Sequence, residues 1–153
     1  MSYEESRRVQ REAVAEFRAN GGKLGGVYEQ FDVLLLTTEG EGGERRTVPV
    51  GYVRDGERLV VFAADNGRER GPNWFHELVA RPRVEVEVGR EVWSMVASVA
   101  TGEERKRLWD GQIERWGFLK DMQAEVSWEI PIVVLTVCDE DVEGDWTHID
   151  RTR

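Results

Sequence analysis

The chain has 153 residues, which is enough for one domain with one hydrophobic core. Hydrophobic residues make up 40% and charged residues 33% of it, so the composition is that of a globular protein and excludes a disordered one. The formal net charge of −9 disfavours nucleic acids and anionic membranes as partners, because both are polyanions.

The sequence also lacks the marks of export. The first eight residues contain no apolar segment of the kind that a secretory signal needs, and the longest apolar runs, such as 33–36, are far too short to cross a bilayer. The one cysteine, Cys138, excludes an internal disulfide. We therefore expect a single cytoplasmic domain over residues 1–153, without a transmembrane segment.

The chain opens with an amphipathic helix, expected over residues 3–19. Val9, Ala13 and Phe17 recur at a spacing of four, and polar residues fill the other faces. Gly21 and Gly22 should end this helix, because glycine tolerates the left-handed backbone angles of a helix terminus.

Six segments with the pattern of strands follow. Segment 31–38 is short and apolar throughout, as in a buried strand, whereas 84–88 alternates between apolar and polar residues. The glycine-rich turn at 39–44 and the pair Asp55-Gly56 predict hairpins. The expected strands are 31–38, 46–53, 59–64, 84–88, 92–99 and 130–137.

Two further helical stretches lie between these strands. A short helix over 72–79 begins with Pro72, which suits a first helical turn. A longer stretch runs from Thr101 to about residue 126: Thr101 and Glu104 have the spacing of a capping box, and Gly117 predicts an interruption. Residues 138–153 form an acidic tail.

The order of these elements predicts the fold class. Consecutive hairpins favour antiparallel pairing, and a curled sheet of this size tends to close into a barrel. We therefore predict an α+β protein in which about six mostly antiparallel strands, within residues 31–137, form a barrel. An N-terminal helix, a short middle helix and a longer late helix accompany it.

Two common kinds of catalytic site find no support in the sequence. His76 and His148 are the only histidines, and neither stands at ligand spacing from a cysteine or carboxylate, so we expect no metal. No Gly-x-Ser-x-Gly motif is present, and Cys138 follows a buried strand, where a thiol is inert.

Two kinds of side chain are candidates for holding a ligand at one end of the barrel. Four arginines flank the two loops expected to meet there, and arginine is the natural fork for phosphate or carboxylate. They are Arg45, Arg46, Arg68 and Arg70. The indoles of Trp74 and Trp116 can stack on a flat ring system. Surface salt bridges for the arginines and core packing for the tryptophans stay open as alternatives.

An ordered set of strings resembles the deazaflavin-dependent nitroreductase family. The resemblance runs from about residue 10 to 137 and includes the glycine-rich segment 17–26 and the helix that begins at Pro72-Asn73-Trp74. The remaining strings are 34–38 with 46–50, 81–89, 101–105 and 130–135. The resemblance implies a split β-barrel of the type that binds flavin mononucleotide, and an enzyme that uses the 8-hydroxy-5-deazaflavin coenzyme F-420. Such enzymes transfer a hydride to quinones, nitroaromatics or other conjugated molecules.

The same resemblance implies roles for particular residues. Arg46 matches the arginine of the family's phosphate-binding turn, and Trp74 matches a pocket tryptophan. Pro49 and Val50 match positions beside the deazaflavin ring, and Arg70 falls where a basic residue is common. Together with Arg45 and Arg68, these residues make up the expected cofactor site.

Several positions depart from the family pattern. The first turn, usually basic, reads Glu39-Gly40-Glu41-Gly42-Gly43, a loop lysine is replaced by Asp65, and a helix asparagine by Glu77. Four positions that hold tyrosines in the best-known member lack those hydroxyls here, which predicts a more apolar substrate pocket. They are Gly51, Trp116, Leu119 and Met122.

These departures leave a second hypothesis open. The chain would then be a cofactor-free split-barrel enzyme, an isomerase or cyclase in natural-product biosynthesis, or a small-molecule binder. Glu77 or Asp65 would act as general acid or base, since an apolar pocket raises the pKa of a carboxyl group. Flavin mononucleotide or haem, as in other split barrels, is a third option, and the scarcity of histidines weakens haem.

Overall fold

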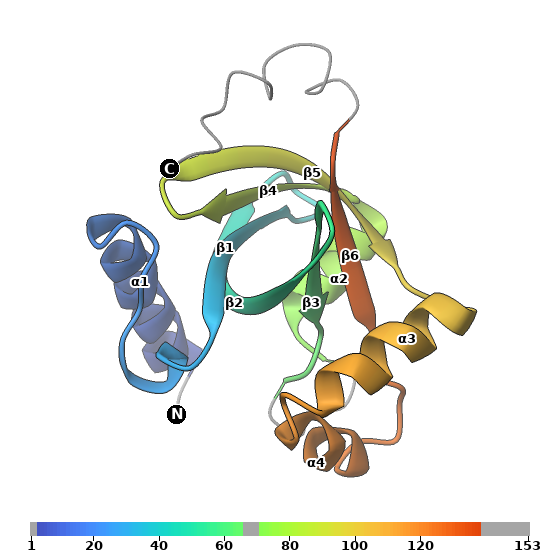
Figure 1. The fold of residues 1–153 in the computed structure, drawn as a ribbon. Helices are drawn as coiled ribbons and strands as arrows, with labels where there is room; N and C mark the ends of the chain where they lie inside the picture. The colour runs from blue at the N-terminus through green and yellow to red at the C-terminus, as the bar shows by residue number, and fades with distance from the viewer. Residues whose placement is uncertain (1–2, 66–70, 139–153) are drawn as a thin grey trace.

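The computed structural model describes residues 3–65 and 71–138 (Figure 1). The expected arginines Arg68 and Arg70 and the acidic tail beyond residue 138 lie outside these ranges. No helix within the described ranges is both long and apolar enough to cross a membrane.

Six strands, all paired antiparallel, form a closed barrel in the order β1-β2-β3-β6-β5-β4 (Figure 1). The strands are β1 (Asp32–Glu39), β2 (Arg45–Asp55), β3 (Arg58–Phe62), β4 (Arg83–Val88), β5 (Glu91–Val99) and β6 (Ile132–Val137). The barrel closes where Leu36 of β1 lies opposite Val86 of β4. The predicted fold class is confirmed, with strand boundaries shifted by at most two residues.

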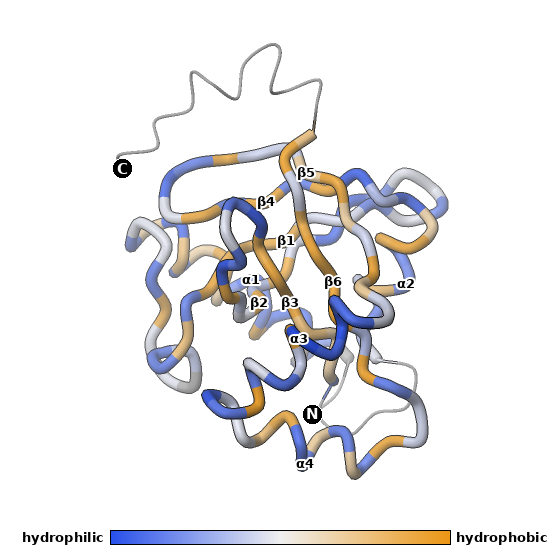
Figure 2. Tube along the Cα trace, turned by 45° about the vertical axis from the view of Figure 1, so that its right-hand side comes forward, coloured by the Kyte–Doolittle hydropathy of each residue, from blue (hydrophilic) through white to orange (hydrophobic). Residues whose placement is uncertain are grey.

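Alternation along the strands separates the inside of the barrel from the outside. Leu34 and Leu36 of β1 belong to the main core cluster, whereas Val33 and Leu35 point outward and are buried with Phe17. Figure 2 shows that β3 and β6 are hydrophobic along most of their length, while α3 and α4 mix hydrophobic and hydrophilic residues. The strands β3 and β6 read as continuous apolar runs because helices cover the face that would otherwise meet water.

The helices pack around this barrel. They are α1 (Tyr3–Ala19), α2 (Asn73–Ala80), α3 (Gly102–Ile113) and α4 (Phe118–Ala124), with a short 3-10 turn η1 (Gly26–Tyr28). Helix α1 lies along the side of the barrel formed by β1 and β2, and α3 and α4 lie on the other side (Figure 1). The amphipathic pattern predicted for α1 is confirmed, because Phe17 is fully buried against the barrel.

The late helical stretch agrees with the expectation in one respect and differs from it in another. It is two helices, with Gly117 at the N-cap of the second, so the interruption predicted there is real. Thr101 does occupy the N-cap of α3, but its side chain makes no capping hydrogen bond, and the predicted capping box is wrong. The carboxylate of Glu104 instead accepts a hydrogen bond of 2.8 Å from Arg58, 46 residues away.

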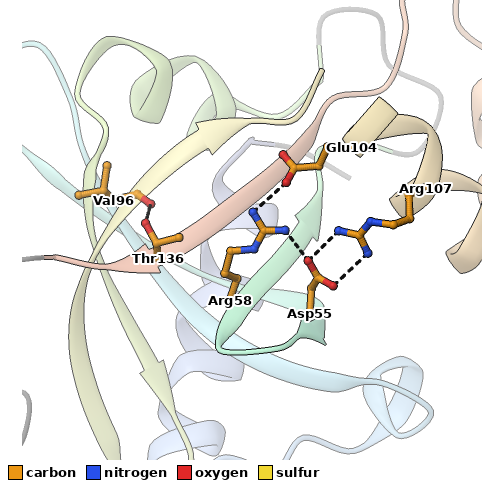
Figure 3. Close-up of polar contacts among 6 residues, drawn as sticks. All are labelled: Asp55, Arg58, Val96, Glu104, Arg107 and Thr136. Carbon is orange, nitrogen blue, oxygen red and sulfur yellow. Dashed lines mark hydrogen bonds and ion pairs between the residues drawn. The ribbon is translucent and has the colours of Figure 1, made fainter. Parts of the chain in front are cut away.

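That contact belongs to a group of charged residues at the end of β2, the Asp55 cluster (Asp55, Arg58, Glu104 and Arg107; Figure 3). Asp55 accepts two hydrogen bonds from Arg107, of 3.0 and 3.1 Å, and a further one from Arg58. These hydrogen bonds, first that of Arg107 and then that of Arg58, lower the pKa of Asp55 to about 2. The cluster ties the β2–β3 hairpin to α3.

Candidate active site

The opposite end of β2 carries a second arginine–carboxylate group, built where β1 ends and α2 crosses it. Thr38 of β1 lies opposite Arg46 of β2 in the strand register. Glu77 of α2 places one carboxylate oxygen, Oε1, between them. This oxygen accepts a hydrogen bond of 2.8 Å from the hydroxyl of Thr38 and one of 3.0 Å from Nε of Arg46. We call Thr38, Arg46 and Glu77 the Arg46 cluster. It joins α2 to the first hairpin.

The cluster is largely withdrawn from water on the carboxylate side. Thr38 is 1% exposed, and the side chains of Glu77 and Arg46 are 16% and 32% exposed. Among the described residues, the guanidinium of Arg46 is hydrogen-bonded only through Nε, although it carries five N–H donors. An arginine held at Nε can present its two terminal nitrogens to an anion as a fork.

Arg45 lies on the other face of the hairpin, because successive residues of a strand point to opposite sides. Its Nη2 lies 3.2 Å from a carboxylate oxygen of Glu85 on β4, and the two side chains are 58% and 39% exposed. Next to this pair, the hydroxyls of Thr37 and Thr47 lie 2.8 Å apart. Arg45 is thus an exposed cation on the outer face, and Arg46 a half-buried one at the barrel end.

The tryptophan expected to border a ring, Trp74, lies on α2 one turn before Glu77. It is 8% exposed and belongs to the core cluster inside the barrel, together with Val48. Val50 packs against the same cluster, whereas Pro49 points to the outer face, in register with Leu35. The predicted cofactor residues therefore lie on two sides of β2.

Two of the four residues expected to line the substrate pocket come together on the outer face of β2. The ring of Trp116 lies at the open side of Gly51, so a side-chain carbon at position 51 would be 3.7 Å from it and 3.7 Å from Phe31. Trp116 meets Phe31 edge to face at 5.2 Å and stacks on Phe118 at 5.8 Å and 21°. We call Phe31, Trp116 and Phe118 the aromatic group.

The other two substrate-pocket residues are on α4. Leu119 is 1% exposed and belongs to a second buried cluster under α3 and α4, against which Trp116 packs. Met122 is half-buried. The structure gives neither residue a contact with Gly51, so this pair extends the apolar surroundings of Trp116 rather than the surface of β2.

The two carboxylates considered as acid–base groups lie in different surroundings. Glu77 is engaged in the Arg46 cluster, whereas Asp65 is half-buried at the edge of segment 66–70, which lies outside the described residues. Within residues 3–65 and 71–138, no three His, Cys, Asp or Glu side chains gather where they could hold a metal ion.

Three aromatic residues of these contacts were not predicted from the sequence as site residues: Phe31, Phe118 and Trp128. Trp128 packs edge to face on Phe75 at 5.8 Å and stacks on the ring of His76 at 6.3 Å. It also lies so close to Gly71 that a side-chain carbon there would be 2.4 Å from the indole. The high tryptophan content was the available signal, but it could not show which indoles meet.

A cavity of about 600 Å³ opens beside Trp128, between α3 and the segment after α4. Arg105 forms part of its wall. Nη1 of this arginine already donates a hydrogen bond of 2.7 Å to the carbonyl oxygen of Ile130, and its Nε lies 3.1 Å from Oε1 of Glu129. None of the predicted site residues lines this cavity. The cavity is therefore separate from the Arg46 cluster.

The chain resembles a known protein family over most of its length. The sequence profile of the F420H(2)-dependent quinone reductase family matches residues 9–137. An F420H(2)-dependent quinone reductase of Mycobacterium tuberculosis (strain H37Rv) is 31% identical over 130 residues, which cover 80% of this chain and 85% of that protein.

Solved structures show the same similarity. A structure of an F420-H2 dependent reductase (FDR-A) has a TM-score of 0.61 and 28% identity, and the match covers 67% of this chain and 92% of that chain. A structure described as a domain-swapped dimer has a TM-score of 0.64 and 26% identity over 88% of this chain and 99% of that chain.

Proposed function

The chain belongs to the F420H(2)-dependent quinone reductase family, and from this premise we propose that it transfers a hydride from reduced coenzyme F-420 to a quinone-like or otherwise conjugated apolar small molecule. The cofactor of this oxidoreductase is coenzyme F-420. We further propose the cytoplasm as its location, which the single, buried Cys138 supports because no internal disulfide can form.

The described residues fit a coenzyme with an anionic tail at one place. The observation that carries the site assignment is the Arg46 guanidinium, held at Nε by Glu77 while its terminal nitrogens make no hydrogen bond to any described residue. A fork of two N–H groups is the geometry with which arginine binds phosphate. We therefore assign the coenzyme's phosphate to Arg46.

The other cofactor residues have supporting roles in this proposal. Arg45 adds an exposed positive charge on the neighbouring face. The roles predicted for Arg68 and Arg70 stay predictions, because both lie outside the described residues. By the family resemblance, Val50 and Trp74 on the inner side of β2 and Pro49 on its outer side are the candidates for contact with the ring system. Because Trp74 and Val50 pack in the barrel core, their positions are rigid, which suits the orientation of a planar ligand.

Gly51 and the aromatic group offer the acceptor an apolar surface, and the buried Leu119 supports Trp116 from beneath. Met122, which is half-buried on α4, adds to these apolar surroundings. When bound, the coenzyme supplies the hydride, and the protein has no bond-breaking chemistry to perform itself. The chain's own residues hold the two molecules together, align them and exclude water. A histidine or cysteine is therefore not needed for this reaction.

Fluorescence titration with oxidised coenzyme F-420 tests the proposal. We expect saturable binding to the wild-type protein, weakened by added salt because the tail is anionic. The absence of saturation up to about 100 μM would contradict it, since a dissociation constant above that range corresponds to less than about 5.5 kcal/mol of binding free energy.

A further inference from the structure

Glu77 presents a negative charge to the residue that we assign to the phosphate. Its Oε1 is 3.0 Å from Nε of Arg46, and the same oxygen accepts the hydrogen bond of the buried Thr38 hydroxyl. The carboxylate is therefore fixed from two directions and cannot swing away into solvent without losing both hydrogen bonds. An anion on the terminal nitrogens of Arg46 would share one guanidinium with it.

This arrangement differs from the other ion pair of the first hairpin. The Arg45–Glu85 pair has both partners more than a third exposed, so water and salt screen its charges. The side chain of Glu77 is only 16% exposed, and a charge in such surroundings acts more strongly on its neighbours. Of the two carboxylates that face these arginines, Glu77 is the one whose charge an incoming anion would feel.

We propose that Glu77 is a built-in counter-anion that sets the affinity of the site for the coenzyme: it keeps Arg46 in place and at the same time opposes the binding of an anionic tail. The proposal rests on the assigned function and deepens it. Glu77 would then determine specificity. Because its charge weakens the electrostatic attraction of the anionic tail, contacts with the ligand's rings must supply a larger share of the binding free energy.

Replacing Glu77 by glutamine separates charge from geometry. The glutamine Oε1 can still accept from Thr38 and from Arg46, whereas the negative charge is gone. The matched control is Glu87→Gln, which changes the net charge equally but lies on β4, where Glu87 pairs with Arg18 of α1 at 2.8 Å. Binding of oxidised coenzyme F-420 is measured by fluorescence titration at several salt concentrations.

We expect Glu77→Gln to lower the dissociation constant about tenfold and to make its salt dependence steeper, because one opposing charge is removed. Glu87→Gln should stay within about twofold of the wild type. Glu77→Ala removes the charge and both hydrogen bonds, so it should bind less tightly than Glu77→Gln, in which Arg46 stays in place. Saturable binding by the Glu77→Gln protein alone would support the proposal too.

The outcomes separate this inference from the proposed function. If the wild type binds the coenzyme and Glu77→Gln binds equally or less tightly, the proposed role of Glu77 as a counter-anion is wrong. The proposed function as a reductase is not affected by that result. If neither protein saturates up to about 100 μM, the site assignment fails and the inference fails with it. If circular dichroism shows that neither Glu77 variant folds, Glu77 is a structural residue and the proposal is overturned.

Discussion

Strand β2 carries an arginine–carboxylate cluster at each end, and the two clusters differ in how completely their hydrogen bonds are used. At its end, Asp55 accepts from two arginines, and one of these, Arg58, also binds Glu104, so that four side chains are joined (Figure 3). At its beginning, one carboxylate, Glu77, holds one nitrogen of one arginine.

The same residue types therefore serve different purposes at the two ends. In the Asp55 cluster the charges satisfy one another, and the cluster acts as a cross-link between the β2–β3 hairpin and α3. In the Arg46 cluster donors remain, and these donors can bind an anion. Unused donors next to a rigid partner, rather than the number of arginines, mark the candidate site.

The largest effect is expected at the beginning of the strand. Arg46→Ala removes the fork and leaves Glu77 facing the coenzyme's tail, so binding should weaken about thirtyfold, or about 2 kcal/mol. Fluorescence titration measures it, with Arg107→Ala of the Asp55 cluster as the matched control. Equal affinity of the Arg46→Ala and wild-type proteins would remove Arg46 from the site.

The next effect concerns stability and the other end of the strand. Asp55→Asn leaves Arg58 and Arg107 without their shared counter-charge, and the free energy of unfolding should fall by about 1 kcal/mol, a value reduced because these side chains are partly exposed. Urea denaturation measures the loss. Coenzyme affinity should not change, and a variant that lost affinity but kept its stability would reverse the roles of the two clusters.

The pH dependence of stability tests the same difference between the two clusters. The pKa of Asp55 is about 2 in the folded protein, below the ordinary value of about 3.9, so its contribution to stability is present above about pH 4 and is lost as the pH falls toward 2. The difference in unfolding free energy between the wild type and Asp55→Asn should thus shrink by up to about 1 kcal/mol between pH 5 and 2. A difference that stayed constant with pH would show that Asp55 is not the titrating group.

The smallest effect is expected in the middle of β2. Gly51→Ala places a methyl group 3.7 Å from Phe31 and Trp116, an ordinary contact distance, and glycine is not required there by its backbone angles. The unfolding free energy should change by less than about 0.5 kcal/mol, and coenzyme affinity should not change. The KM for a quinone acceptor should change, because the methyl group meets the aromatic group; an unaltered KM would place the acceptor elsewhere.

The sequence predicted the features that depend on neighbouring residues. Alternation and turn residues located six strands, the helical period located α1, and Gly117 located the break between α3 and α4. The failed capping box at Thr101 marks the limit: the local pattern was correct, but Arg58, distant in sequence, took the carboxylate of Glu104. Tertiary contacts override local ones where they satisfy a charge better.

The site was harder to predict for the same reason. Arg46 and Glu77 were both singled out, one for the cofactor and one as a base, but no local rule places a helix residue on an arginine 31 residues before it. The meeting of Phe31 with Trp116 likewise depends on how α3 and α4 fold back on the barrel. Residue types could be read from the sequence, and their pairing could not.

The assignment of the phosphate to Arg46 is best tested by a crystal structure of the protein with oxidised coenzyme F-420. We expect the coenzyme's phosphate within hydrogen-bond distance, about 3 Å, of the terminal nitrogens of Arg46, with Nε still on Glu77. A phosphate bound away from Arg46, for example in the cavity beside Arg105 and Trp128, would contradict the assignment.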